Sequence, residues 1–208
     1  MTVRRAGAAD VRSPGREVGD SCARGEREGL LGPGPQPWQA SRVAPDTPLR
    51  DAEHANVGRV RAAAAALGLD IEVRRFPEGT RTAQDAATAI GCPVGAIVKS
   101  LIFTVDGEVV LALVSGANQL DEAKLAAAAG GRACGRATAD QVRAATGFPI
   151  GGVPPLGLST RVREFLDEDL LGFDTVWAAA GTWHDVFPIA PADLARASGG
   201  WVGDLRRA

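Results

Sequence analysis

The stretch IVKSLIFTVDGEVVLALVS, residues 97–115, decides the fold. It holds two apolar, β-prone runs, 97–105 and 108–115, joined by Asp106-Gly107. An Asp-Gly pair between two such runs is a strong signal for a two-residue hairpin turn, because both central residues of that turn adopt positive φ angles. The sequence therefore predicts an antiparallel β-hairpin here.

Helical signals lie on both sides of this hairpin. Thr82 and Asp85 form a capping-box pattern at the start of an alanine-rich segment, and Thr138 with Gln141 repeats that pattern further on. Helix-ending glycines follow the apolar periodicity. The expected helices are 56–67, 83–90, 121–129, 138–146 and 191–197.

Further strand signals are shorter. Ile71 and Val73 alternate with charged residues, and the runs 161–165 and 175–180 are β-prone, the second followed by a turn at 181–185. Strands and helices mix without a regular βαβ alternation. We expect an α+β fold, a single domain with a mixed, strongly curved, barrel-like sheet surrounded by helices.

The first 45 residues differ from the rest in composition. They are rich in Gly, Pro, Arg, Ser and Glu and show hardly any apolar periodicity, which is typical of segments that do not order themselves. We expect residues 1–45 to be a disordered extension and residues 46–208 to form one domain. Apolar runs stay shorter than the roughly 20 residues of a membrane-spanning helix, so a cytoplasmic location is expected.

The charge balance limits the kind of nucleic-acid partner. The formal net charge is -2, which argues against a protein that coats long stretches of phosphate backbone. A partner contacted only at its tip stays open. Of the 23 basic residues only Lys99 and Lys124 are lysines, so each lysine needs an explanation.

Lys99 lies on the first hairpin strand, on one face with Leu101, Phe103 and Val105. An ammonium group on an apolar face is unfavourable unless it reaches solvent or meets a polar partner in a cleft. Both readings stay open from the pattern alone. Lys124, within a helix, is expected on a solvated face.

Two glycine-containing loops are candidate binding elements. Residues 148–157 hold three prolines and three glycines, and around Gly151 and Gly152 backbone groups can approach a ligand closely, as in an oxyanion hole. The turn at 181–185 carries His184, which could orient a substrate or act as an acid or base. A purely structural turn is the alternative in both cases.

Several catalytic classes lack their motifs. The sequence has no G-x-S-x-G, H-E-x-x-H or P-loop pattern. Its three cysteines, Cys22, Cys92 and Cys134, have no C-x-x-C spacing, so neither a disulfide framework nor a zinc site is expected. Ser100 and Ser115 are expected to serve the sheet.

These landmarks, in this order, resemble the YbaK/EbsC family, which is related to the editing domain inserted in bacterial prolyl-tRNA synthetases. The most specific match is the Val-Lys-Ser-Leu strand at 98–101 followed by the Gly-Gly-Val-Pro-Pro loop at 151–155. Further matching stretches are 81–87, 111–116 and 178–182.

The resemblance implies an aminoacyl-tRNA deacylase. Its substrate would be the acceptor end of a tRNA, typically tRNA(Pro), whose terminal adenosine carries a wrong small amino acid such as Cys, Ala, Ser or Thr. The family's essential lysine corresponds to Lys99 and its glycine loop to Gly151 and Gly152. The resemblance implies that the protein uses neither a metal nor an organic cofactor. A membrane and DNA are not expected as partners, whereas prolyl-tRNA synthetase is a further expected partner. The expected amino-acid pocket is lined by Thr82, Ser115, Gly181 and His184.

One departure from the family concerns specificity. The chain has Trp183 within Ala180-Gly181-Thr182-Trp183-His184, where the synthetase domain carries a Gly-Ala-Asn-like segment with a later histidine. A bulky indole there would narrow the pocket. Two other functions stay open: a non-catalytic module that binds aminoacyl-tRNA or a synthetase, and a hydrolase of another small ester.

Overall fold

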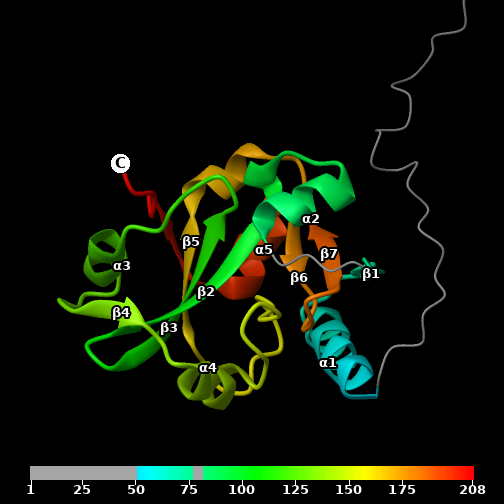
Figure 1. Ribbon diagram of the computed structural model, residues 1–208, viewed down its shortest axis with the longest axis horizontal. Helices are drawn as coiled ribbons and strands as arrows, with labels where there is room; N and C mark the ends of the chain where they lie inside the picture. Colours follow the sequence, from blue (N-terminus) through cyan, green and yellow to red (C-terminus); the bar gives the residue numbers. More distant parts are fainter. Residues whose placement is uncertain (1–50, 77–81) are drawn as a thin grey trace, which may run out of the picture. The chain divides into compact units, whose positions relative to one another are not determined.

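Figure 1 shows a computed structural model of the chain, in which residues 51–76 and 82–208 are described. The expected extension at residues 1–45 lies outside the described residues. The helices are α1 (Asp51–Ala66), α2 (Ala83–Ile90), α3 (Glu122–Ala128), α4 (Ala139–Thr146) and α5 (Pro191–Ser198). The strands are β1 (Arg74–Arg75), β2 (Val98–Val105), β3 (Glu108–Ser115), β4 (Cys134–Arg136), β5 (Arg163–Asp167), β6 (Val176–Ala179), β7 (Asp185–Ile189) and β8 (Trp201–Gly203). Val94–Ala96 and Glu168–Gly172 form short 3₁₀ helices.

The hairpin expected at residues 97–115 is confirmed. Strands β2 and β3 pair antiparallel over their whole length, from Val98 opposite Ser115 to Val105 opposite Glu108. Between them Asp106 and Gly107 have φ angles of 49° and 89°, as a type I′ turn requires. The Asp106 carboxylate also accepts hydrogen bonds from the backbone of Arg132 at 3.0 Å and Ala133 at 2.9 Å. This contact ties the turn to the segment that enters β4.

The expected single barrel-like sheet is wrong, although the α+β class is confirmed. The strands form a five-stranded sheet in the order β4-β2-β3-β5-β8 and a three-stranded sheet in the order β1-β7-β6. In both, the outer strands do not pair with each other, so neither sheet closes. One isolated bridge, between Ile97 and Trp177, links the two. The larger sheet is mixed, because β3 with β5 and β5 with β8 run parallel.

Most helices lie where the capping residues in the sequence predicted them. Thr82 and Thr138 form complete capping boxes, and Asp121 accepts hydrogen bonds from two backbone N–H groups of α3. The positions of the shorter strands were predicted less accurately. The strand expected at 71–73 is a two-residue strand at 74–75, and β4, β7 and β8 were not expected. Leu67, expected on the apolar face of α1, is exposed.

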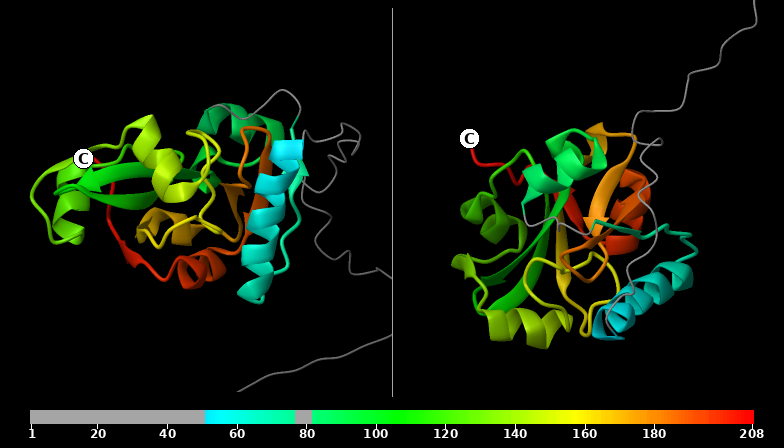
Figure 2. Two further views of the ribbon diagram at one scale, coloured as in Figure 1. Left: turned by 90° about the horizontal axis from the view of Figure 1, so that it is seen from below. Right: turned by 45° about the vertical axis from the view of Figure 1, so that its right-hand side comes forward.

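Both faces of the larger sheet are covered. One face packs on α1, α4, α5 and the smaller sheet through residues such as Val60, Leu113 and Phe187. The other packs on α3 through Phe103, Val114 and Leu125. Figure 2 shows α1 beside the smaller sheet at one end, with α3 and β4 at the opposite end. In the described part of the chain, no helix has the length and apolarity needed to cross a bilayer.

Candidate functional site

A cleft runs along β2, between α3 and β4 on one side and the glycine-proline loop on the other. Its volume is about 590 Å³, within the range typical of small-molecule sites. Lys99, Ser100 and Ile102 of β2 line it together with Ile150, Gly151 and Val153 of the loop. Its remaining polar lining comes from Gln119, Glu122, Arg136 and Arg207.

The topology of β2 explains why the cleft forms there. One edge of β2 is paired with β3 throughout, whereas the other edge pairs with β4 only from Phe103 to Val105. Ile97 forms the bridge to the smaller sheet, and the Ile102 carbonyl accepts a hydrogen bond from Ala137 at 3.3 Å. Within the described residues, the stretch 98–101 therefore has no strand partner on this edge. The loop with Gly151 lies opposite this open edge.

Lys99 is half-buried at the cleft, and its ammonium donates a hydrogen bond to the carbonyl of Asn118. Burial lowers the pKa of Lys99 below its ordinary value, while the negative charge of Asp167 opposes part of this shift. The ammonium is thus held by one polar neighbour and one acidic neighbour, with the cleft beside it. This geometry favours the hypothesis that the Lys99 ammonium meets a polar partner in a cleft, and not the alternative that it reaches solvent.

An acidic network, missed from the sequence, surrounds this lysine. The Asn118 side-chain amide donates to Asp167 and to Asp169, both at 2.8 Å. Asp167 is fully buried and also accepts the backbone N–H of Ser115 at 3.1 Å. The network fixes Asn118, and through its carbonyl the position of the ammonium. Three consecutive acidic residues at the end of a strand, 167–169, were the available signal.

Ser100 is a second residue that the sequence did not single out. Its hydroxyl oxygen is buried and has no hydrogen-bond partner within residues 51–76 and 82–208. A buried hydroxyl without a partner is unfavourable in a folded protein. Ser100 lines the cleft, so this hydroxyl lies close to the space that a ligand would occupy, and a small local shift would bring it within reach of one. The expectation that Ser100 serves the sheet stays a prediction.

The two loop glycines differ in their surroundings. Gly151 is exposed at the cleft with φ at 85°, and its N–H bonds to nothing in the described chain. Gly152 is buried, and its N–H donates to the Pro149 carbonyl at 3.1 Å. A Cβ on Gly152 would lie 2.9 Å from the Thr182 Cα. Gly151 is therefore an available donor on the exposed part of the loop, whereas Gly152 allows the loop to pack on the 181–185 turn.

Trp183 contacts this loop from outside the cleft. Its indole N–H donates to the Ile150 carbonyl at 2.5 Å, and a Cβ on Gly151 would lie 2.7 Å from the Nε1 atom. Trp183 does not belong to the cleft lining. Its contacts hold the loop backbone in place and do not fill the cleft.

The four residues expected to line an amino-acid pocket lie outside the cleft lining. Thr82 caps α2, and the buried Ser115 hydroxyl donates to the Gly95 carbonyl at 2.8 Å. Gly181 packs against Phe148 and Asn56. The half-buried His184 has its Nδ1 3.3 Å from the Phe76 carbonyl. Contacts between these four and a substrate stay predictions.

The turn at 181–185 is closed by its own polar contacts. The Thr182 hydroxyl donates to the buried Asp185 carboxylate and accepts the backbone N–H of His184 and of Asp185, both at 3.1 Å. Arg75 lies 3.6 Å from the same carboxylate. Among the described residues no group of three His, Cys, Asp or Glu side chains is arranged to hold a metal ion.

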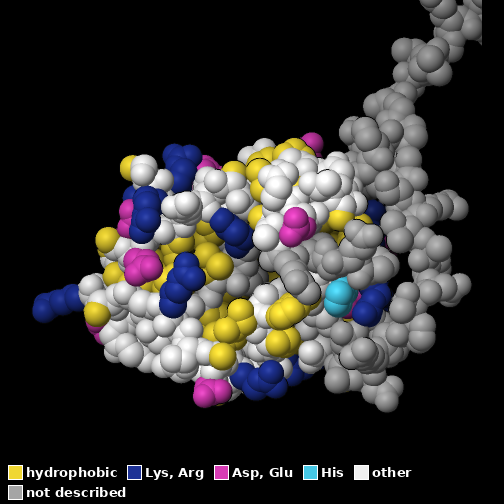
Figure 3. Space-filling view, in the orientation of Figure 1, with side chains coloured by type: hydrophobic (Ala, Val, Ile, Leu, Met, Phe, Trp, Pro, Cys, Tyr) yellow, Lys and Arg dark blue, Asp and Glu magenta, His cyan; other side chains and the backbone are white. Residues whose placement is uncertain are grey.

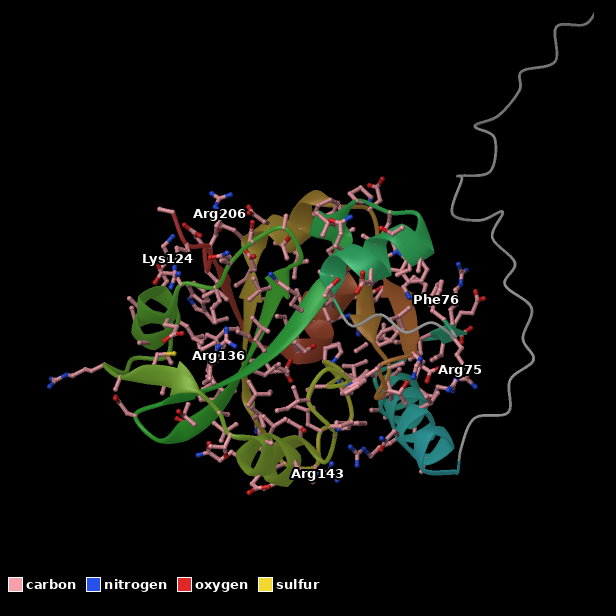
Figure 4. All side chains as sticks on the ribbon, viewed as in Figure 1. Arg75, Phe76, Lys124, Arg136, Arg143 and Arg206 are labelled. Carbon is pink, nitrogen blue, oxygen red and sulfur yellow. The ribbon has the colours of Figure 1, made fainter. Side chains whose placement is uncertain are left out.

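Figure 4 shows where the basic side chains lie around the cleft. Arg136 projects between α3, β4 and α4, and Arg206 and Lys124 lie further along the same side, beyond α3. Lys124 bonds Asp204 at 2.6 Å, and Arg206 bonds Asp169 at 2.9 Å. These two cations are thus paired with carboxylates, whereas Arg136 lies nearer the cleft and lines it.

Comparison with known proteins gives related results at three levels. A family model described as an aminoacyl-tRNA editing domain matches residues 77–197. The proline--tRNA ligase of Nitratidesulfovibrio vulgaris (strain Hildenborough) is 40% identical over 107 residues, which are 51% of this chain but only 18% of the ligase. The uncharacterized protein YwhH of Bacillus subtilis is 32% identical over 128 residues, 61% of this chain and 81% of YwhH.

A solved structure matches most of the chain. A crystal structure described as that of a candidate trans-editing enzyme for prolyl tRNA synthetase is 42% identical, with a TM-score of 0.71, and the match covers 77% of this chain and 100% of that one. The family match includes Lys99, the loop glycines and the 181–185 turn. With more than half of its residues inside that match, the chain belongs to the aminoacyl-tRNA editing domain family.

Proposed function

We propose that this protein is a trans-editing deacylase, which hydrolyses the ester between a wrong amino acid and the terminal adenosine of a tRNA. The observation that carries the proposal is the half-buried ammonium of Lys99, held in a cleft beside the exposed backbone of Gly151. Family membership supports the reaction class. The ligase and structural relatives support tRNA(Pro) as the substrate and prolyl-tRNA synthetase as a partner.

Lys99 on β2 and Gly151 on the loop, which line the cleft from opposite sides, have different roles in the proposed reaction. Lys99 binds an oxygen of the terminal nucleotide, and as a compact cation with three donors it can do so while keeping its bond to the Asn118 carbonyl. The N–H of Gly151 donates to the ester carbonyl, where negative charge develops when water attacks. Ser100 supplies a hydroxyl for a ribose or amino-acid polar group.

The bound amino acid is proposed to be a small one such as Ala, Cys, Ser or Thr. Ile150 and Val153, which line the cleft on the side of the loop, are the apolar residues available to contact its side chain. We propose residues 46–208 as the catalytic domain and the cytoplasm as its location.

The test is deacylation of tRNA(Pro) charged separately with Ala, Cys, Ser, Thr and Pro. The wild type should release one or more of the wrong amino acids and leave prolyl-tRNA intact, and Lys99→Ala should lower kcat/KM by about 100-fold or more, as removal of a charged group near a reacting centre does. Lys99→Arg should fail to restore the rate. The matched control is Lys124→Arg, the other lysine, which keeps its contact with Asp204 and should deacylate normally.

Two results would contradict the proposal. Unchanged turnover in Lys99→Ala removes the lysine from the mechanism. Tight binding of mischarged tRNA by the wild type, with no release of the amino acid, would instead support a non-catalytic binding module.

A further inference from the structure

Most basic side chains near the cleft are already engaged by acidic partners. Lys124 pairs with Asp204, Arg206 with Asp169 and Arg163 with Glu108. Elsewhere, Arg196 pairs with Asp193 and Arg75 with Asp185. These pairs leave little charge free for a polyanion.

Arg136 and Arg207 differ from this pattern. Both are exposed, both line the cleft, and neither guanidinium has a hydrogen-bond or ion-pair partner among the described residues. Lys99 is the third cation of the lining, and Glu122 is its one acidic group. The cleft lining therefore has a net charge of +2, in a chain whose formal net charge is -2.

The backbones that carry the two arginines are fixed. Arg136 ends β4 and pairs with Phe103 of β2. The backbone N–H of Arg207 donates to the Gln119 carbonyl at 2.8 Å, and Arg206 forms a bridge with Leu120. The guanidinium groups therefore extend from anchored positions near the cleft rim. A guanidinium offers a planar fork of donors that matches phosphate oxygens.

Figure 3 shows apolar side chains on this face with several Lys and Arg side chains, and a few Asp and Glu side chains, around them. An apolar floor with a basic rim suits a single-stranded polynucleotide end, since the bases contact the floor and the phosphates meet the cations. A neutral ester offers no anionic group to two guanidinium groups, and a free amino acid offers only one carboxylate, whereas successive phosphates of a strand can reach both.

We infer that Arg136 and Arg207 form a phosphate-binding subsite for the unpaired nucleotides that precede the terminal adenosine of the RNA. The inference rests on the proposed function, since it extends the same cleft. The two arginines hold the strand while Lys99 and Gly151 face the terminal ester. Arg136 and Arg207 make no contribution to the bond-breaking step.

Binding and turnover together test this subsite. In the Arg136→Gln/Arg207→Gln double variant, the Kd for uncharged tRNA(Pro) should rise by roughly 3- to 10-fold at moderate salt, and the slope of log K against log salt should become shallower by about 1.4, because each phosphate contact on a single strand contributes about 0.7. KM for mischarged tRNA should rise with kcat unchanged. Cleavage of an aminoacyl-adenosine without phosphates should keep its wild-type rate.

The matched control is Arg132→Gln/Arg161→Gln, which removes two arginines that lie outside the cleft and have no ion-pair partner among the described residues. It should leave both the Kd and the salt slope near wild type. An unchanged salt slope in the cleft variant, or an equal change in the control, would overturn the subsite. Failure of the proposed function gives another pattern: no turnover of any substrate by the wild type, with the salt slope of tRNA binding still dependent on Arg136 and Arg207.

Discussion

The glycine-proline loop at 148–157 and the turn at 181–185 both interrupt the regular elements and pack on each other, yet they differ in how their polar groups are hydrogen-bonded. In the loop, Gly151 lines the cleft and its N–H has no hydrogen-bond partner among the described residues. In the turn, the Thr182 hydroxyl and the Asp185 carboxylate satisfy each other and nearby backbone groups. A site keeps donors unsatisfied until a ligand arrives, whereas a support element satisfies its own. This difference fits the proposed role of the loop as a binding element, with the turn as its support.

A substitution at the contact between the loop and the turn should have the largest effect on stability and on kcat/KM. In Gly152→Ala the added Cβ would lie 2.9 to 3.1 Å from backbone atoms of Thr182, which have little freedom to move. We expect destabilisation by about 1–3 kcal/mol from overpacking, and a loss of kcat/KM of about 100-fold because the loop is displaced from the substrate. Thermal unfolding and deacylation rates measure the two effects.

Gly58→Ala is the control for this substitution. A Cβ at Gly58 meets nothing within 4 Å, and alanine in a helix is more stable than glycine by about 0.5–1 kcal/mol. Its Tm should rise slightly with normal activity. A Gly152→Ala protein with wild-type Tm and turnover would show that the loop does not depend on the turn.

Asp185→Asn should separate stability from activity. The substitution removes the buried negative charge beside Arg75 and weakens the bond with Thr182, at a cost of about 1–3 kcal/mol. The Tm should fall by several degrees, while kcat/KM at low temperature stays close to wild type. In Asp193→Asn, which weakens an exposed pair with Arg196, neither quantity should change measurably. A large loss of kcat/KM with an unchanged Tm would place the turn within the site.

Trp183→Phe tests the hydrogen bond between the turn and the loop. It removes the indole donor to the Ile150 carbonyl but keeps an aromatic ring, so the expected loss of stability is about 1 kcal/mol. We expect kcat to fall several-fold, since the loop loses a fixed contact. Trp201, which is similarly exposed and packs on Phe165, provides the control: Trp201→Phe should leave kcat unchanged. Equal effects of the two substitutions would remove the special role of Trp183.

The smallest effect concerns pH. Burial lowers the pKa of Lys99, so a rate that requires its ammonium should decrease with rising pH before an ordinary lysine would titrate. Asp167 raises this pKa, and Asp167→Asn should therefore move the alkaline limb of kcat/KM to lower pH. Asp185→Asn, in the turn, should leave the limb in place. An upward shift in Asp167→Asn would exclude Lys99 as the titrating group.

Features set by neighbouring residues were predictable from the sequence. The Asp106-Gly107 turn fixed the hairpin, and the capping boxes at Thr82 and Thr138 fixed the starts of two helices. Parallel pairing of β3 with β5 has no such local signal. That pairing brings Asp167 to Asn118, 49 positions apart in the chain. The lysine was therefore identified from the sequence, whereas the network that holds it was not.

The open edge of β2 has a consequence for the behaviour of the protein in concentrated solution. An unpaired strand edge is a template on which another chain can add a strand, the first step of aggregation. This edge cannot be closed by pairing without losing the cleft. A charged lysine at Lys99 and a loop with three prolines nearby are the features that discourage strand addition. The residue proposed to hold the substrate would thus also protect the free protein from self-association.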